Sequence, residues 1–168
     1  DVNPRHNLPG APMLDYFSGI LLLLGLGVAV SRWKETSLAT LPVWGFIMIL
    51  PGVLTLPWEA PQSLRTITVI PAVVAMCALG ISVIWINGRN APWTWIRRST
   101  VPLVLALLAA IAYINVDTYF GRQAQDPNVF ASFSTDETLI AQHMIAQQSR
   151  GHNLWVSRQF LFSLTTKL

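Results

Sequence analysis

Four intervals of this chain contain no Asp, Glu, Lys, Arg or His, and they constrain its fold more than any other feature. The charge-free intervals are residues 16–31, 36–58, 66–88 and 99–116. A helix needs roughly 20 apolar residues to cross a bilayer core of about 30 Å, with an accepted range of about 17–25, and three intervals are long enough. The first is slightly short, but Met13 and Leu14 extend it if Asp15 lies among the lipid headgroups.

The expected fold is therefore an all-α membrane protein with four transmembrane helices, followed by a short extracytoplasmic α/β tail. The helices are expected over about residues 14–31, 38–56, 67–87 and 100–119, within a transmembrane domain of residues 1–120. The alternative is a soluble helical bundle with a very apolar core. Such a bundle needs a polar face on each helix, and the stretch Val101–Ala112 has none.

Prolines indicate where individual segments begin or end, and flanking charges indicate what kind of segment the first one is. Pro102 is expected to begin the fourth helix, where a missing N–H costs nothing. Pro51 and Gly52 lie late in the second segment and are expected to kink or unwind it near the outer surface. A signal peptide is the alternative for the first segment, but Arg32 and Lys34 follow its apolar run instead of preceding it.

Lys and Arg are enriched in the cytoplasmic loops of membrane proteins, and this rule sets the expected orientation. Five basic residues flank one set of helix ends, against three on the other: Arg32, Lys34, Arg89, Arg97 and Arg98 against Arg5, Arg65 and Arg122. Residues 32–37 and 88–98 are therefore expected in the cytoplasm. The protein is expected in the cytoplasmic membrane with both chain ends outside, and this bias explains the net charge of +3 without any nucleic acid.

Residues 121–168 are more polar and are expected to form an incomplete small domain outside the membrane. Asp126, Pro127 and Asn128 indicate a turn. Ser134 and Glu137 have the spacing of a capping box and predict a helix that Gly151 could terminate. Residues 154–157 resemble a short strand. One helix and one strand cannot bury a core alone, so we expect the chain to continue past Leu168 or the tail to dock on the membrane part. The chain begins at Asp1, without an initiator Met, in a loop-like stretch, so we expect it to be a piece of a longer polypeptide, whose remainder is a partner.

Composition and spacing exclude several functional classes. An apolar content of 52% excludes disorder, and the single Cys77 excludes an internal disulfide. The three histidines have no ligand spacing, so no metal site is expected, and no phosphate-loop motif implies a cofactor. Uncharged helix interiors disfavour an ion-coupled transporter, because such proteins need ionisable residues at membrane depth.

The outer loop 57–65 carries the candidate site residues Glu59, Gln62 and Arg65. An Arg beside a helix N-terminus suits a phosphate group, since it offers a bidentate cation near free N–H groups. Glu59 could orient that Arg or bind a sugar hydroxyl. The alternative is structural: Arg65 extends to the interface along its apolar stem and Glu59 is solvated.

Several short motifs resemble the later membrane region of bacterial protein-mannosyltransferase-like proteins, which belong to the GT-C class of integral-membrane glycosyltransferases. The motifs are Asn7–Asp15, Arg32–Lys34, Leu50–Leu54, Glu59–Arg65, Ile70–Ala72 and, in the tail, Tyr119–Phe120 through Phe133–Thr135. The resemblance implies transfer of a sugar from a polyprenyl-phosphate carrier to an acceptor on the outer face of the membrane. It also implies membrane lipid and the lipid-linked donor as partners.

By this resemblance, Arg65 lies where the protein approaches the lipid-linked phosphate, and Glu59 and Gln62 line the same cavity. The catalytic acid of the class lies in an outer loop near the protein's N-terminus, so no catalytic residue is assigned in this chain. A different class remains open: a non-enzymatic membrane scaffold or assembly subunit whose outer tail binds a partner.

Overall fold

The computed structural model describes residues 7, 8, 10–54, 63–133 and 135–151. Within these residues the chain contains helices and no strand. The elements in chain order are α1 (Tyr16–Ser31), α2 (Thr36–Val53), the 3₁₀ helix η1 (Ser63–Val69), α3 (Ile70–Arg89), α4 (Thr94–Val116), the π-helix η2 (Asp117–Gln123), α5 (Pro127–Ser132) and α6 (Thr135–Gln148). The expected all-α architecture of the membrane domain is thus observed for the described residues.

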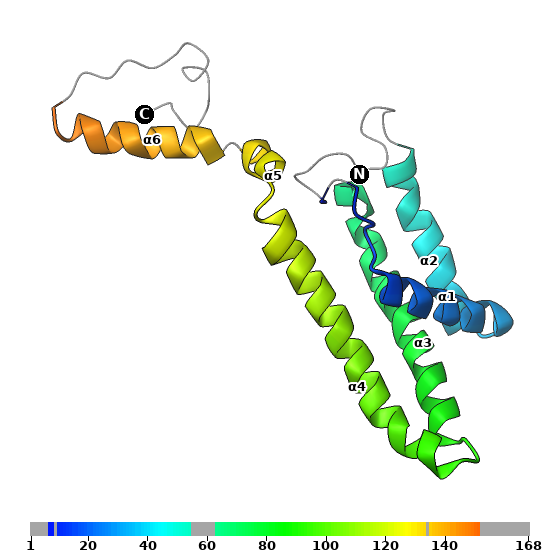
Figure 1. Cartoon of the computed structure of the whole chain (residues 1–168). Coiled ribbons are helices and arrows are strands. Elements are labelled where there is room, and N and C mark those ends of the chain that lie inside the picture. The colour runs from blue at the N-terminus through cyan, green and yellow to red at the C-terminus, as the bar shows by residue number, and fades with distance from the viewer. Residues whose placement is uncertain (1–6, 9, 55–62, 134, 152–168) are drawn as a thin grey trace.

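Among the described residues, three helical stretches are long and apolar enough to cross a membrane, and the expected fourth span is not confirmed. They are Thr36–Val53, Arg65–Arg89 and Thr94–Gln123. Helix α1 is apolar but has only 16 residues, which is about 24 Å of helix. Figure 1 shows that α1 lies across α2 and α3, whereas α3 and α4 meet at the turn that joins them and diverge toward their other ends.

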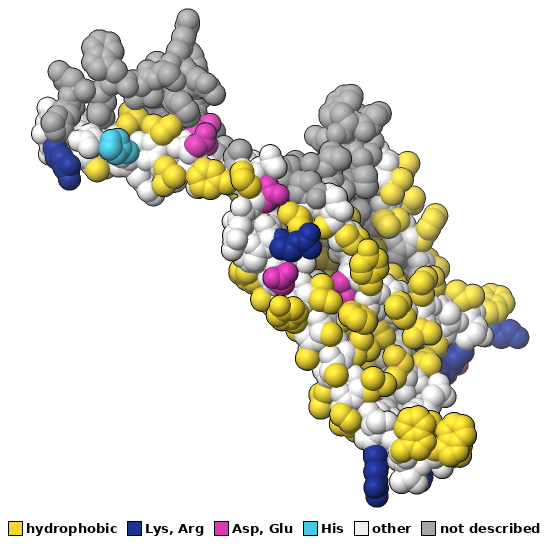
Figure 2. Space-filling view, viewed as in Figure 1, with side chains coloured by type: hydrophobic (Ala, Val, Ile, Leu, Met, Phe, Trp, Pro, Cys, Tyr) yellow, Lys and Arg dark blue, Asp and Glu magenta, His cyan; other side chains and the backbone are white. Residues whose placement is uncertain are grey.

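The apolar side chains of these helices cover the outside of the molecule instead of filling a core. Leu105 is 62% exposed and Phe46 is 67% exposed, and no large side chain in the described residues is fully buried. Figure 2 shows hydrophobic side chains spread over α2, α3 and α4. A water-soluble monomer rarely exposes so much contiguous apolar surface. Lipid tails or a further apolar protein surface must therefore cover these helices.

Helices α1 and α3 touch backbone to backbone because each contributes a glycine. A Cβ at Gly25 would lie 2.6 Å from the carbonyl carbon of Met76, and one at Gly80 would lie 3.0 Å from that of Leu21. The residues buried along α1 follow one another every four positions, as do those along α3: Leu21, Gly25 and Ala29, and Ala72, Met76 and Gly80. Small residues at such spacing allow close helix packing where lipid gives no hydrophobic drive.

Two more glycines lie where α3 packs against α2 and α4. A Cβ at Gly45 of α2 would lie 3.8 Å from Cβ of Ala72, which is ordinary contact. A Cβ at Gly88 would lie 2.8 Å from Cγ2 of Thr100, so α3 and α4 approach closely beside the turn that joins them. These contacts place α3 at the centre of the helical assembly, with α1, α2 and α4 around it.

The turn between α1 and α2 lies at a different level from the turn between α3 and α4. Gly45 is level with Ala72. At a rise of about 1.5 Å per residue, Thr36, at the start of α2, lies ~13 Å along the helix axis from Gly45. Arg89, at the end of α3, lies ~25 Å along the helix axis from Ala72, in the same direction. The α3–α4 turn therefore extends about 12 Å farther along the α3 axis. In Figure 1 the α1–α2 turn lies partway along α3, whereas the α3–α4 turn lies at its end.

Two prolines were expected to lie at or near helix ends, and the structure differs from this expectation at one of them. Pro102 does not begin the fourth helix, because α4 already starts at Thr94 and contains Pro102 in its interior. Residues 94–99 are helical although Arg97 and Arg98 interrupt the apolar pattern there. At the other proline, α2 ends at Val53, two residues after Pro51.

The described part of the tail is helical, so the α/β character expected for residues 121–168 is not seen there. Helix α6 confirms the predicted helix, and Gly151 follows it with a φ of 75°. The expected turn at Asp126 instead opens α5: Oδ1 of Asp126 accepts the backbone N–H of Asn128 at 2.8 Å, directly after which the helix continues. The predicted strand over 154–157 lies outside the described residues.

Candidate functional site

Arg65 is the one predicted site residue that lies in the described part of the chain. It belongs to η1, which leads into α3, and its side chain is exposed. Glu59 and Gln62 lie outside the described residues, so the structure does not place them beside it. The expected grouping of the three side chains remains a prediction.

The residues around Arg65 hold it at the start of the apolar stretch. Thr66 is buried directly beside it, and η1 packs against α2, where Val69 lies 3.9 Å from a Cβ at Gly45. Pro71 then occupies the first turn of α3, where its missing N–H is not needed. Arg65 is thereby held on an exposed surface at the first residue of a 25-residue apolar helical stretch. A guanidinium there can bind phosphate oxygens bidentately.

A second polar group lies where the start of α1 meets the end of α4, and the sequence analysis did not predict it. Asp15 caps α1: its carboxylate accepts the backbone N–H of Ser18 at 3.0 Å and the Ser18 hydroxyl at 2.6 Å. Nδ2 of Asn115, near the end of α4, donates to the same carboxylate at 2.9 Å. The three side chains thus join the start of α1 to the end of α4.

Electrostatics favour the charged form of Asp15. Partial burial raises the pKa of this carboxyl, but the hydrogen bonds from Ser18 and Asn115 outweigh burial and hold the pKa below its ordinary value. The Asp15-x-x-Ser18 spacing is a signal for a helix N-cap that could have been used. The sequence does not predict Asn115 as the partner of Asp15, because no pattern in it indicates which helices pack together.

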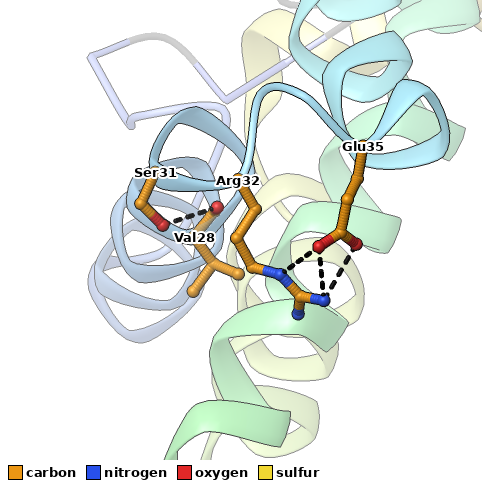
Figure 3. A network of polar contacts seen from close by, with 4 residues as sticks. All are labelled: Val28, Ser31, Arg32 and Glu35. Carbon is orange, nitrogen blue, oxygen red and sulfur yellow. Dashed lines mark hydrogen bonds and ion pairs between the residues drawn. The ribbon is translucent and has the colours of Figure 1, made fainter.

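The α1–α2 and α3–α4 turns, which lie at different levels along α3, differ in charge. In the α1–α2 turn, Nε and Nη2 of Arg32 each donate to a different carboxylate oxygen of Glu35 at 2.8 Å (Figure 3). Ser31 donates to the carbonyl oxygen of Val28 at 2.9 Å beside this ion pair. The pair neutralises Arg32 and leaves Lys34 as the net charge of the turn.

The α3–α4 turn has three arginines and no acidic residue. Arg89 lies over the ring of Trp85, with its guanidinium carbon 5.9 Å from the ring centroid. Arg97 donates to the Thr94 hydroxyl at 3.4 Å, within its own helix. Among the residues described in the structure, no carboxylate forms an ion pair with Arg89, Arg97 or Arg98.

Cys77 and the possible metal ligands do not form a group of reactive side chains in the described part of the chain. Cys77 lies half-buried in α3, and its thiol donates to the carbonyl oxygen of Ser18 at 3.4 Å, which is a packing contact between helices. Over the described ranges, no three His, Cys, Asp or Glu side chains are grouped so that they could hold a metal ion.

Comparison with protein-family models, with curated proteins and with solved structures found no match to this chain. Its function therefore has to be inferred from its own residues and their arrangement.

Proposed function

We propose that this chain is the C-terminal portion of a membrane glycosyltransferase that transfers a sugar from a polyprenyl-phosphate carrier to an acceptor on the outer face of the membrane. The observation that carries the proposal is Arg65, an exposed cation at the start of a long apolar helical stretch. A lipid-linked phosphate needs a cation at this kind of boundary, because its chain lies in the bilayer and its charge lies at the surface. The resemblance of the surrounding motifs to GT-C enzymes supports the same substrate class.

In this proposal Arg65 stabilises charge and does not transfer a proton. Departure of the polyprenyl phosphate from the sugar builds negative charge on the phosphate, and a positioned guanidinium lowers the energy of that state. Glu59 and Gln62, which lie outside the described residues, are included in this site because the resemblance to GT-C enzymes implies it. The catalytic acid belongs to another part of the complete protein.

The proposed membrane arrangement has four segments, with α1 as an oblique fourth. Asp15 lies among the outer headgroups, where its hydrogen bond from Asn115 ties α1 to the outer end of α4. The α1–α2 and α3–α4 turns face the cytoplasm, because they carry most of the basic residues near helix ends. The 57–65 loop and the tail after η2 face outward from the cytoplasmic membrane.

The test is Arg65→Ala in the complete protein, reconstituted in vesicles with a polyprenyl-phosphate-linked sugar. We expect kcat/KM for the donor to fall at least about tenfold, because a charge that stabilises the leaving group is lost. Arg65→Lys should retain part of the activity. Arg122→Ala, which removes an exposed cation from η2, is the matched control and should leave donor kinetics unchanged. Equal kinetics in Arg65→Ala and the original protein, at equal expression, would remove Arg65 from the site.

One observation favours a second candidate, a membrane scaffold whose outer tail binds a partner. The tail helices α5 and α6 expose Phe130, Leu139 and Ile145, each about half accessible, beyond the end of the apolar spans. A complete protein that consumes no lipid-linked sugar, but loses a defined complex when these three residues are changed to Ser, would favour the scaffold. Turnover of the donor would favour the transferase.

A further inference from the structure

The arginines of the α3–α4 turn do not all point in the same direction. Gly88 of α3 faces Thr100 of α4, since a Cβ at Gly88 would contact the Thr100 side chain. At about 100° per residue, Arg89 is rotated by ~100° from Gly88, and Arg97 by ~60° in the same sense from Thr100. Because α3 and α4 are antiparallel, these two rotations turn Arg89 and Arg97 to the same side of the helix pair.

Arg98 lies on a different side. Its position is about 160° from that of Thr100 around α4, so it points away from α3. The turn therefore presents one face with two guanidinium groups and another with one. The two-arginine face, Arg89 and Arg97, has no carboxylate partner among the described residues. Two neighbouring cations without a counter-ion repel each other, so an anion bound between them lowers their energy.

The surroundings of the two-arginine face are apolar and aromatic. The Arg89 guanidinium lies over the ring of Trp85. Elsewhere at this end of the helix pair, Trp93 and Trp95 are 62% and 69% exposed. Exposed Trp side chains near the ends of apolar helices are typical of the membrane–water interface. Along α4, Arg97, Val101, Leu105 and Leu108 follow at i, i+4, i+8 and i+11, so an apolar stripe continues directly from Arg97 along one side of the helix.

We propose that Arg89 and Arg97 bind the phosphate of an anionic phospholipid headgroup, whose acyl chain lies along the Val101–Leu108 stripe of α4. A free phosphate would use the two guanidinium groups but not the stripe, where Leu105 and Leu108 are exposed. This lipid site lies at the opposite end of the apolar helices from Arg65. It goes beyond the proposed glycosyl transfer and depends only on membrane insertion.

The experiment measures lipid binding to the purified full chain in a neutral detergent by native mass spectrometry. The chain is titrated with phosphatidylglycerol, with phosphatidylcholine of the same acyl chains, and with phosphatidylglycerol in the presence of millimolar inorganic phosphate. We expect preferential binding of phosphatidylglycerol, which inorganic phosphate at this concentration does not displace.

Four variants then locate the site. Arg89→Gln and Arg97→Gln should each lower the affinity for phosphatidylglycerol about tenfold, because each loses a charge-assisted bidentate contact. The matched control Arg98→Gln removes the same charge from the same turn but from its other side, and should change the affinity less than about twofold. Arg97→Lys keeps the charge without the bidentate geometry and should give an intermediate affinity.

Three results would overturn the proposal. Equal losses in Arg97→Gln and Arg98→Gln would indicate diffuse attraction to a basic turn, equal binding of the two lipids would exclude headgroup recognition, and displacement by inorganic phosphate would indicate a site for the free ion. If a Gln variant loses its helical circular-dichroism spectrum, Arg97→Lys compared with Arg98→Lys decides the same question. No sugar donor is present, so these outcomes are independent of the outcome with Arg65→Ala.

Discussion

Gly25 of α1 lies directly against the backbone of Met76 in α3. A Cβ at this glycine would lie 2.6 Å from the Met76 carbonyl carbon, a distance that side-chain movement cannot relieve because the clash is with backbone. The reciprocal contact, Gly80 against Leu21, lies one helical turn away. The packing of α1 across α3 therefore depends on a missing side chain in each helix.

Substitution of Gly25 should separate these helices. We expect Gly25→Leu to destabilise the protein by at least about 1–3 kcal/mol, because the new side chain forces α1 away from α3. The measurement is the unfolding midpoint in detergent. Gly27→Leu is the matched control two residues away, where a Cβ meets nothing within 4 Å. Equal midpoints for the two variants would contradict the close contact between α1 and α3.

Acid should weaken the tie between α1 and α4. The pKa of Asp15 is lower in the folded protein than the ordinary value of about 3.9, so its hydrogen bonds stabilise the fold above that value and are lost as pH falls through the lower folded pKa. Between pH 6 and pH 3, the thermal unfolding midpoint of the original protein should therefore fall more than that of Asp15→Asn. Asp117→Asn, an exposed carboxylate at the end of α4, serves as control. A pH profile unaffected by Asp15→Asn would contradict the role of this carboxylate.

The Arg32–Glu35 ion pair should contribute little to stability. Both side chains are about half exposed, at 57% and 47%, and exposed pairs contribute roughly 0.2–1 kcal/mol. Glu35→Gln should lower the free energy of unfolding by no more than about 1 kcal/mol in detergent. A loss of about 3 kcal/mol or more would instead indicate that the pair is shielded from water and that Arg32 is left uncompensated. Lys34→Gln on the same turn is the control for removing one charge.

The apolar pattern predicted where helices occur, because a charge-free run of helical length has few other stable forms. The apolar pattern did not predict where the helices begin and end. Helix α4 starts at Thr94, before the polar Arg97 and Arg98, and its Thr100 lies against Gly88 of α3. The π-helix η2, with Ala124 N–H donating to the Tyr119 carbonyl at 3.0 Å, has no sequence signature that could have been recognised.

The candidate site, like the fold, could be predicted from the sequence only in part. Arg65 could be singled out because a cation beside a long apolar stretch is visible in the sequence. The Asp15–Asn115 contact could not be, since it joins residues that are 100 positions apart and depends on which helices are neighbours. The same holds for Arg89 and Arg97, whose shared side follows from the Gly88–Thr100 contact and not from their spacing.

The central claim is that α3 and α4 cross a membrane as an antiparallel pair, with the α3–α4 turn in the cytoplasm. It is tested most directly by single cysteines at Asn90, in the α3–α4 turn, and at Ser149, beyond α6, in a Cys77→Ala background. Intact cells are treated with a membrane-impermeant thiol reagent. The account predicts that position 149 is labelled in intact cells and position 90 only after permeabilisation. Labelling of both positions in intact cells would contradict it.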